Sequence, residues 1–256
     1  MRSCQCSSMI VRMQQHLAPV ASSAPATTWG RAFASLYDPF LWTGERAGVR
    51  QLRRTLLGQA RGRTVDIGSG SGLNLPHFPD HLDELVLAEP DPAMRDRLTR
   101  RLEGSRSRAR LIDAPAEQLP FADHSIDTVV SSFVLCTVTD PDLALREIAR
   151  VLRPDGQLLF IEHVRSDSPT LARWQDRLDT PWRRFARGCR CNRATAQLIV
   201  ACGFELATLR VATWRAMPPI VRPLVIGRAQ PRTKAPADTG SPVDHALSAP
   251  ARGAGR

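Results

Sequence analysis

Short apolar runs alternate with amphipathic stretches through the middle of this chain. The runs are rich in Val, Ile and Leu and are bounded by Gly, Pro and Asp. Continuous apolar runs of this length predict strands that are buried on both faces of a sheet. They fall at residues 63–67, 84–88, 109–113, 128–133, 157–164, 204–211 and 224–229.

Two of the gaps between these runs show helical periodicity, at 92–103 and 141–152. In the second gap an apolar stripe recurs at helical spacing through Leu145, Ile148 and Val151. Such a stripe predicts an amphipathic helix with one face against the core.

The second helix carries clear boundary signals. Asp140 is a suitable N-cap, and Pro141 suits the first helical position. The sequence Arg-Pro-Asp-Gly at 153–156 predicts a turn that ends the helix before the next strand. Alternating strands and helices predict an α/β fold, a Rossmann-like doubly wound sheet with helices on both faces.

A length of 256 residues suits one α/β domain, which we place at 29–229. Residues 1–28 and 230–256 are rich in Ser, Ala, Pro and Gly, which predicts a disordered leader and a disordered tail. Within the domain we expect residues 164–191 to form an insertion on the substrate side, over the ends of the strands.

The formal charge of +10 raises the question of a nucleic-acid partner. Almost all the positive charge is arginine, Lys234 is the only lysine, and the arginines are scattered rather than clustered. This pattern favours a small-molecule ligand, and no nucleic-acid partner is expected.

The cysteines form no C-x-x-C pair, so no metal site is predicted. Free thiols are typical of a reducing compartment, and we expect a cytoplasmic protein. The sequence has no apolar run long enough to span a membrane, which leaves peripheral contact with a membrane surface open. It does not indicate an oligomeric state.

The most informative segment is a glycine-rich loop directly after the first predicted strand. Gly68, Gly70 and Gly72 follow Asp66 at alternate positions. Glycines let the backbone approach a ligand closely, and ligands of doubly wound sheets bind outside the carboxyl ends of the strands. A tight turn without a ligand is the alternative.

The spacing of this loop distinguishes between ligands. A dinucleotide fingerprint requires Gly or Ala where Leu73 stands, and a phosphate-binding P-loop requires a lysine that is absent. A carboxylate before the loop suits a cofactor with a cationic end. Glu89, at the end of the second strand, has the distance from the loop expected of an acid that binds both ribose hydroxyls.

Several segments of the sequence together resemble a known family. The segments VDIGSGSG, AEPDPAM, AEQLPFADHSIDTVVSSFVLCTV and REIARVLRPDGQLLFIEHV are similar to the successive motifs of class I methyltransferases that use S-adenosylmethionine (SAM). Within that class the chain resembles the UbiE-like group and the methyltransferase-like 7 proteins. The resemblance implies a sheet order of 3-2-1-4-5-7-6, with the last strand antiparallel.

The resemblance also implies site residues. Asp66 would order the loop or reach the amino group of SAM, Glu89 would hold the ribose, and Ser132 would line the cofactor near the methyl group. Pro115 stands where many relatives carry Asp or Asn, which puts one polar contact to adenine in doubt. The other implied cofactor contacts are Gly68, Gly70 and Ser71 around the methionyl part, and Ala116 and Glu117 beside adenine.

Methyl transfer from a sulfonium mainly requires alignment and exclusion of water, and sometimes removal of a proton. We predict His163 at the end of the fifth strand as the general base. Asp179 would orient a base, or would pair with Arg183.

Three classes of acceptor remain. The narrower resemblance favours a small thiol, and the UbiE-like resemblance permits methylation of carbon or oxygen on a lipophilic quinone or phenol. An amine or phospholipid head group is third. A thiol needs little help from a base, which fits the absence of an obvious catalytic dyad. A SAM-binding protein without catalytic activity is the alternative from another class.

Overall fold

The computed structural model describes residues 27–232, and these build a seven-stranded sheet in the order β3-β2-β1-β4-β5-β7-β6. All neighbouring pairs from β3 to β5 are parallel, and β7 is antiparallel to both β5 and β6. The predicted fold class and strand order are therefore confirmed. The strands are β1 (Arg63–Ile67), β2 (Glu84–Ala88), β3 (Arg110–Ile112), β4 (Ile126–Ser132), β5 (Leu152–His163), β6 (Phe204–Thr213) and β7 (Pro223–Pro231).

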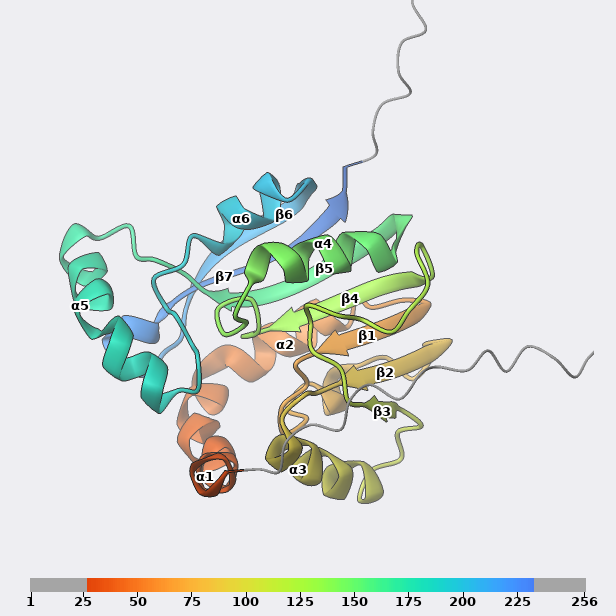
Figure 1. Ribbon diagram of the computed structural model, residues 1–256, viewed down its shortest axis with the longest axis horizontal. Helices are drawn as coiled ribbons and strands as arrows, with labels where there is room; N and C mark the ends of the chain where they lie inside the picture. Colours follow the sequence, from red (N-terminus) through yellow and green to blue (C-terminus); the bar gives the residue numbers. More distant parts are fainter. Residues whose placement is uncertain (1–26, 233–256) are drawn as a thin grey trace, which may run out of the picture.

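Helices cover both faces of this sheet (Figure 1). The α-helices are α1 (Thr28–Gly44), α2 (Arg50–Leu57), α3 (Pro92–Glu103), α4 (Pro141–Val151), α5 (Pro169–Phe185) and α6 (Thr195–Ala201). A π-helix, η1 (Glu45–Val49), joins α1 to α2, and short 3-10 helices lie at η2 (Leu75–His77) and η3 (Pro219–Val221).

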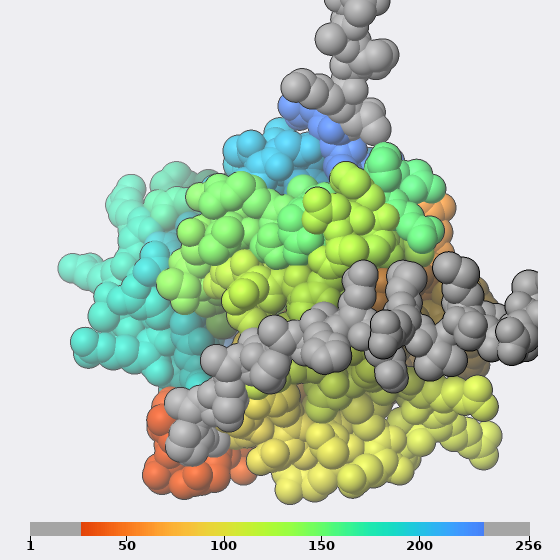
Figure 2. Space-filling view, turned by 45° about the vertical axis from the view of Figure 1, so that its right-hand side comes forward, coloured from red at the N-terminus to blue at the C-terminus, as the bar shows by residue number. Residues whose placement is uncertain are grey.

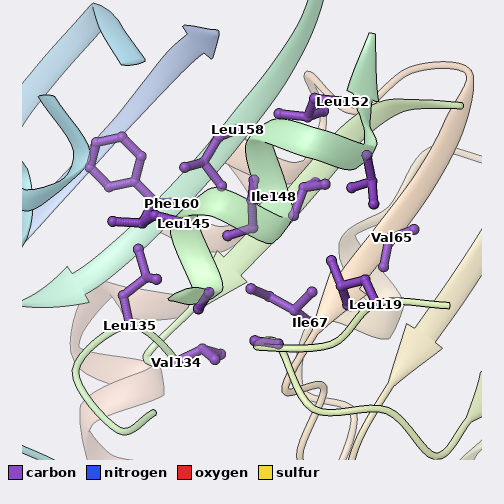
Figure 3. Close-up of a cluster of buried hydrophobic side chains, with 14 of the residues drawn as sticks. Val65, Ile67, Leu119, Val134, Leu135, Leu145, Ile148, Leu152, Leu158 and Phe160 are labelled. Carbon is purple, nitrogen blue, oxygen red and sulfur yellow. The ribbon is translucent and has the colours of Figure 1, made fainter. Parts of the chain in front are cut away.

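The central strands are buried on both faces because side chains alternate across a strand. On β4, Val129 belongs to the core cluster beneath α4 and α6, whereas Val130 belongs to the cluster beneath α2. On β5, Phe160 and Ile161 divide in the same way. Figure 3 shows the first cluster, where side chains of α4 pack on those of β1 and β5. This double burial explains the continuous apolar runs in the sequence.

The predicted signals around α4 hold at its start. The Asp140 carboxylate accepts a hydrogen bond from the Leu143 amide at 2.9 Å, and Pro141 takes the first turn. The prediction that a turn at 153–156 separates the helix from the next strand is wrong, because β5 already begins at Leu152, directly after α4. Leu152 pairs with Ile126 and Gln157 with Thr128, so this end of β5 carries extra residues as an irregularity of the strand.

The glycine loop is followed by the single 3-10 turn η2. The insertion at 164–191 contains α5. The leader at 1–28 and the tail at 230–256 lie almost wholly outside the described residues. Within residues 27–232, none of the helices is both long enough and apolar enough to cross a membrane.

The parallel strands β1, β2, β4 and β5 end on the side of the molecule where α1 and α5 gather (Figure 1). In Figure 2 these two helices, orange-red and teal, lie one above the other on that side. Rings of both helices are in contact, since the ring centre of Phe185 lies 6.3 Å from that of Trp29 and 6.1 Å from that of Phe40. The two helices therefore cover the edge where a doubly wound sheet binds its ligands.

Candidate functional site

The glycine loop leaves β1 with all three glycines at positive φ: 52° at Gly68, 55° at Gly70 and 86° at Gly72. A Cβ at Gly68 would lie 2.7 Å from Val134, and one at Gly72 would lie 2.6 Å from Leu98. Larger residues would therefore be strained and would also clash. At Gly70 the nearest atom to such a Cβ is 3.9 Å away, so the backbone there borders open space.

A buried polar network lies beneath this loop. The Asn74 amide donates to the Asp66 carboxylate at 2.8 Å and accepts from the Arg53 guanidinium at 2.5 Å. Arg53 also forms an ion pair with Glu45 at 3.1 Å, and the four residues are each less than a tenth exposed. The charge of Arg53 is thus paired with that of Glu45, and Asp66 is a second buried carboxylate without an ion-pair partner of its own in this network.

Burial dominates the chemistry of Asp66. It raises the pKa of this carboxyl from 3.8 to about 7, against the hydrogen bonds from Asn74 and Ser69. One oxygen, Oδ2, is buried without a hydrogen-bond partner among the described residues. A buried carboxylate oxygen without a partner is costly, and a donor or cation from a ligand would satisfy it.

Glu89 lies opposite the loop at the end of β2. Its Oε2 accepts from the Gly70 amide at 2.7 Å, and its Oε1 accepts from the Asp91 amide at 2.8 Å. Burial raises the pKa of Glu89 from 4.5 to about 7 in spite of these bonds. A carboxylate offers about four acceptor positions, so two remain for a ligand.

Helix α1 is attached to this site through Asp38. The Ser71 hydroxyl donates to one Asp38 oxygen, and Arg97 and Arg101 of α3 pair with the other at 3.2 and 2.7 Å. Asp38 therefore ties α1 to the glycine loop and to α3. Sequence reasoning missed this residue because its partners lie far along the chain.

The residues predicted beside adenine take different positions. Ala116 is buried in the core cluster, whereas the Glu117 carboxylate accepts from the Thr139 amide at 3.1 Å before α4. Asp113 forms an ion pair with Arg95 at 2.8 Å. One oxygen of Glu117 is thus engaged with the backbone ahead of α4, and Asp113 is engaged with Arg95.

A cavity of about 320 Å³ lies between α1, α5 and the ends of β4 and β5. A second hollow of about 20 Å³ borders Gly68, Gly70, Asn74 and Ser132. Tyr37 lines both spaces and therefore stands at their junction. Most of the cavity lining is apolar: Trp29, Phe33, Leu36, Pro39, Phe40, Leu41, Phe133, Trp182, Phe185, Ala186, Trp214, Met217 and Val221, with Tyr37, Cys136, Thr137, His163 and Cys189 as its polar members.

His163 lines the cavity, as predicted, but its environment disfavours proton transfer. The imidazole is 5% exposed and lies beside Phe133 and Trp214, with ring centres 4.9 and 5.3 Å away. Burial lowers its pKa to about 4, against a backbone hydrogen bond with Val221. At neutral pH the ring is uncharged and is a weak base.

Asp179 is not among the residues that line the cavity. Its Oδ1 is buried without a hydrogen-bond partner among the described residues, and no ion pair joins it to Arg183 within that part of the chain. Trp182 and Trp214 face the cavity, whereas Trp174 is half exposed beneath Arg177. His163 and Asp179 therefore do not share the cavity wall, which His163 lines together with Trp182 and Trp214.

Glu162, which sequence reasoning also missed, organises the loop that floors the cavity. Its carboxylate is fully buried and accepts bonds from the Ser131 hydroxyl at 2.6 Å and from three successive amides, Val134, Leu135 and Cys136. The residue before these amides, Phe133, has a positive φ of 62°. A charged residue inside an otherwise apolar strand was the available signal.

A protein family and relatives of known function match this chain. The Methyltransferase domain family matches residues 65–160. Human thiol S-methyltransferase TMT1B is 31% identical over 193 residues, which cover 69% of this chain and 77% of that protein. The UbiE ubiquinone/menaquinone C-methyltransferase of Idiomarina loihiensis is 38% identical over 116 residues, or 43% of this chain and 45% of that protein.

Solved structures share the fold. A SAM-dependent methyltransferase from Thermotoga maritima superposes with a TM-score of 0.60 at 21% identity, covering 79% of this chain and 97% of that chain. The N-methyltransferase NodS of Bradyrhizobium japonicum, solved with S-adenosylhomocysteine, has a TM-score of 0.56 at 17% identity over 73% of this chain and 87% of that chain.

Proposed function

The chain belongs to the class I SAM-dependent methyltransferases, and we propose that it transfers the methyl group of SAM to a small, apolar thiol. The observation that carries the proposal is the apolar cavity that meets the glycine-loop hollow at Tyr37. When bound, SAM supplies a methyl group already activated on a sulfonium. The protein then has to seat that cofactor, align the acceptor and exclude water.

The residues around the loop fit such a cofactor. In this proposal Glu89 uses its two remaining acceptor positions for the ribose hydroxyls, and the unpartnered Asp66 oxygen receives the ammonium group. The open backbone of Gly68, Gly70 and Ser71 takes the methionyl part. Ser132, whose hydroxyl is buried without a partner among the described residues, lies along the same hollow. Ala116 and Glu117 remain the proposed neighbours of adenine, Ala116 through its backbone.

Arg53 adds a cofactor contact that the sequence did not suggest. Its guanidinium lines the hollow beside the loop and is held by Glu45 and Asn74. Arginine suits recognition of a carboxylate because its fork of donors matches two oxygens. We assign Arg53 to the carboxylate of the methionyl part, opposite Asp66.

The acceptor side favours a thiol over an alcohol or amine. A cavity walled by aromatic and aliphatic side chains stabilises apolar ligands and penalises unpaired polar ones. Burial lowers the pKa of His163 to about 4, which makes it a poor acceptor for the proton of a weakly acidic hydroxyl. In this proposal His163 contacts the acceptor as an uncharged side chain. Asp179, which lies in α5 outside the cavity lining, has a structural role.

A lipophilic quinone or phenol is the second candidate, and one observation favours it. Trp29, Leu36, Phe40 and Phe185 line the cavity and are each at least 40% exposed, so the apolar wall continues to the surface. A ring could occupy the cavity while a long apolar tail leaves along this rim. Such a rim would also suit peripheral contact with a membrane, and free thiols at Cys136 and Cys189 suit the cytoplasm.

A panel of acceptors tests the proposal. Purified protein with labelled SAM is offered alkyl and aryl thiols, phenols, quinols and amines of matched size, and labelled products are separated. We expect label on thiols, with rates that increase with apolar surface. Transfer to phenols or quinols but not to thiols would favour the second candidate, and SAM binding without transfer to any acceptor would indicate a non-catalytic protein.

A further inference from the structure

Tyr37 is the side chain at which the hollow beside the glycine loop meets the apolar cavity. Among the described residues that line these two spaces, it is the one that both linings share. Its ring belongs to α1 and packs against Phe33, with ring centres 5.6 Å apart. If SAM sits in the hollow and presents its methyl group to the cavity, its sulfur has to lie at this junction, because the methyl group must face the acceptor directly.

The next residue along α1 holds Tyr37 beside the glycine loop. Asp38 accepts a hydrogen bond from the Ser71 hydroxyl, and it pairs with Arg97 and Arg101 of α3 at 3.2 and 2.7 Å. Because Tyr37 and Asp38 are adjacent, these contacts fix the backbone of Tyr37 relative to the loop. The position of the ring is therefore set from the cofactor side of the site.

The sulfur of SAM carries a positive charge, and the two spaces offer it no free carboxylate. Among residues 27–232, those that line the hollow and the cavity include no Asp or Glu. The proposed seating assigns Asp66 and Glu89 to the ammonium group and the ribose. The Glu162 carboxylate already accepts hydrogen bonds from one hydroxyl and three amides. Arg53 lines the hollow but has a charge of the same sign as the sulfonium.

An aromatic ring is the remaining kind of partner for a cation, because the face of the ring carries partial negative charge. Two nearby rings are already engaged. Phe133 has the Arg53 guanidinium 5.2 Å from its centre and is stacked with Trp214 at 4.6 Å, and Trp214 is also stacked with His163. The contact of Tyr37 with its neighbouring ring is tilted by 50° rather than stacked. Burial also raises the pKa of Tyr37, so its side chain stays uncharged.

We propose that the ring of Tyr37 contacts the sulfonium of SAM and recognises its positive charge. This inference rests on the proposed seating of SAM in the hollow, and it does not depend on which acceptor is methylated. The contact holds the methyl group at the entrance to the cavity. It also distinguishes SAM from its demethylated product, S-adenosylhomocysteine (SAH), because the sulfur of SAH is uncharged. The same ring therefore favours replacement of spent product by fresh cofactor.

Calorimetry with SAM and with SAH, in the absence of any acceptor, tests this role. We expect Tyr37→Leu to weaken SAM binding about five- to thirtyfold, the range of a desolvated cation–π contact, and to leave SAH binding nearly unchanged. Tyr37→Phe keeps the ring and should keep the ratio of the two affinities. Trp42→Leu is the control, since Trp42 is an aromatic residue of the same helix that lines neither space.

The ratio of the two affinities separates recognition of charge from packing. Equal losses for both ligands in Y37L, or an unchanged preference for SAM, would overturn the proposal. So would a Y37F variant that behaves like Y37L, because the ring would then contribute nothing. Fluorinated phenylalanines at position 37 provide a second measurement that preserves the shape of the ring. Each added fluorine weakens the negative face, so SAM affinity should fall stepwise while SAH affinity does not; a flat series for SAM would contradict the contact.

The same titrations separate this inference from the seating on which it rests. Glu89→Ala should weaken SAM and SAH alike, because both ligands carry the ribose. If the wild-type protein binds neither ligand, the proposed cofactor site is wrong and the role of Tyr37 falls with it. If the wild-type protein binds both ligands, E89A weakens both and Y37L does not change their ratio, the cofactor site stands and the role of Tyr37 is overturned.

Discussion

At the scale of single residues, burial controls the chemistry of this site. Asp66, Glu89 and His163 are all 5% exposed or less, and desolvation is the largest cause of each shifted pKa. Desolvation raises the pKa of the two acids and lowers the pKa of the imidazole, because in each case it disfavours the charged form. The same side chains in water would be two carboxylates and a useful base.

The ribose role of Glu89 leads to a prediction at this scale. Replacing Glu89 by Ala should weaken SAM binding about ten- to hundredfold, the loss of one or two hydrogen bonds to a charged acceptor. Glu84→Ala is the matched control, because Glu84 begins the same strand and pairs with Arg63 and Arg110 away from the loop. Calorimetry measures both, and equal affinity of the two variants would refute the ribose role.

At the scale of elements, helix α5 is joined to its neighbours by one buried amide. Gln175 of α5 is fully buried, and the two N–H groups of its amide are shared among the carbonyl oxygens of Val164, Cys191 and Ile220, which lie 2.9–3.1 Å from the nitrogen. Its oxygen accepts from the Ser166 amide at 2.8 Å. A single side chain thus joins α5 to the end of β5, to the segment between α5 and α6, and to η3.

We predict that Gln175→Leu lowers the free energy of unfolding by about 2–4 kcal/mol, because it leaves several buried backbone groups without partners. Denaturant titration measures this change. Gln51→Leu is the control, since Gln51 is exposed on α2. A loss below about 0.5 kcal/mol, as for an ordinary surface change, would show that α5 is held by its apolar contacts alone.

At the scale of the whole molecule, the raised pKa values of Asp66 and Glu89 link the stability of the protein, the pH and cofactor binding. A group whose pKa is raised on folding stabilises the protein below its unfolded pKa, and this contribution is lost as pH rises through the folded value. For Asp66 and Glu89 the window runs from about 4 to about 7. Glu84 and Glu147 have lowered pKa values and act in the opposite direction at lower pH.

We therefore expect Asp66 and Glu89 to lower the stability of the cofactor-free protein as pH rises from about 5 to about 7, opposed up to about pH 6.5 by His163, whose pKa is lowered to about 4. Ammonium and ribose hydroxyls prefer the ionised carboxylates, so the increase in Tm caused by SAM should become larger over the same interval. Thermal unfolding with and without SAM measures both trends. Asp66→Asn should flatten the first trend, and a stabilisation by SAM that does not depend on pH would contradict the assigned roles of both acids.

The sequence by itself determined the fold, and it singled out the glycine loop and Glu89 as candidates for a cofactor site. Local patterns were sufficient because burial on both faces produces continuous apolar strands, and because Gly68, Gly70 and Gly72 mark a backbone conformation that residues with a side chain rarely adopt. The loop and Glu89 are also close along the chain, because Glu89 follows β2, the next strand after the loop. The tertiary structure places these residues at one edge, as the topology requires.

Only the tertiary structure decided the acceptor side. The cavity forms where α1 meets α5, more than a hundred residues later, and Cys136 meets Cys189 across 53 positions. Whether His163 is a base depends on the rings of Phe133 and Trp214 around it. Such contacts follow from how distant elements pack, and desolvation depends on everything that surrounds a group, so no local pattern encodes them.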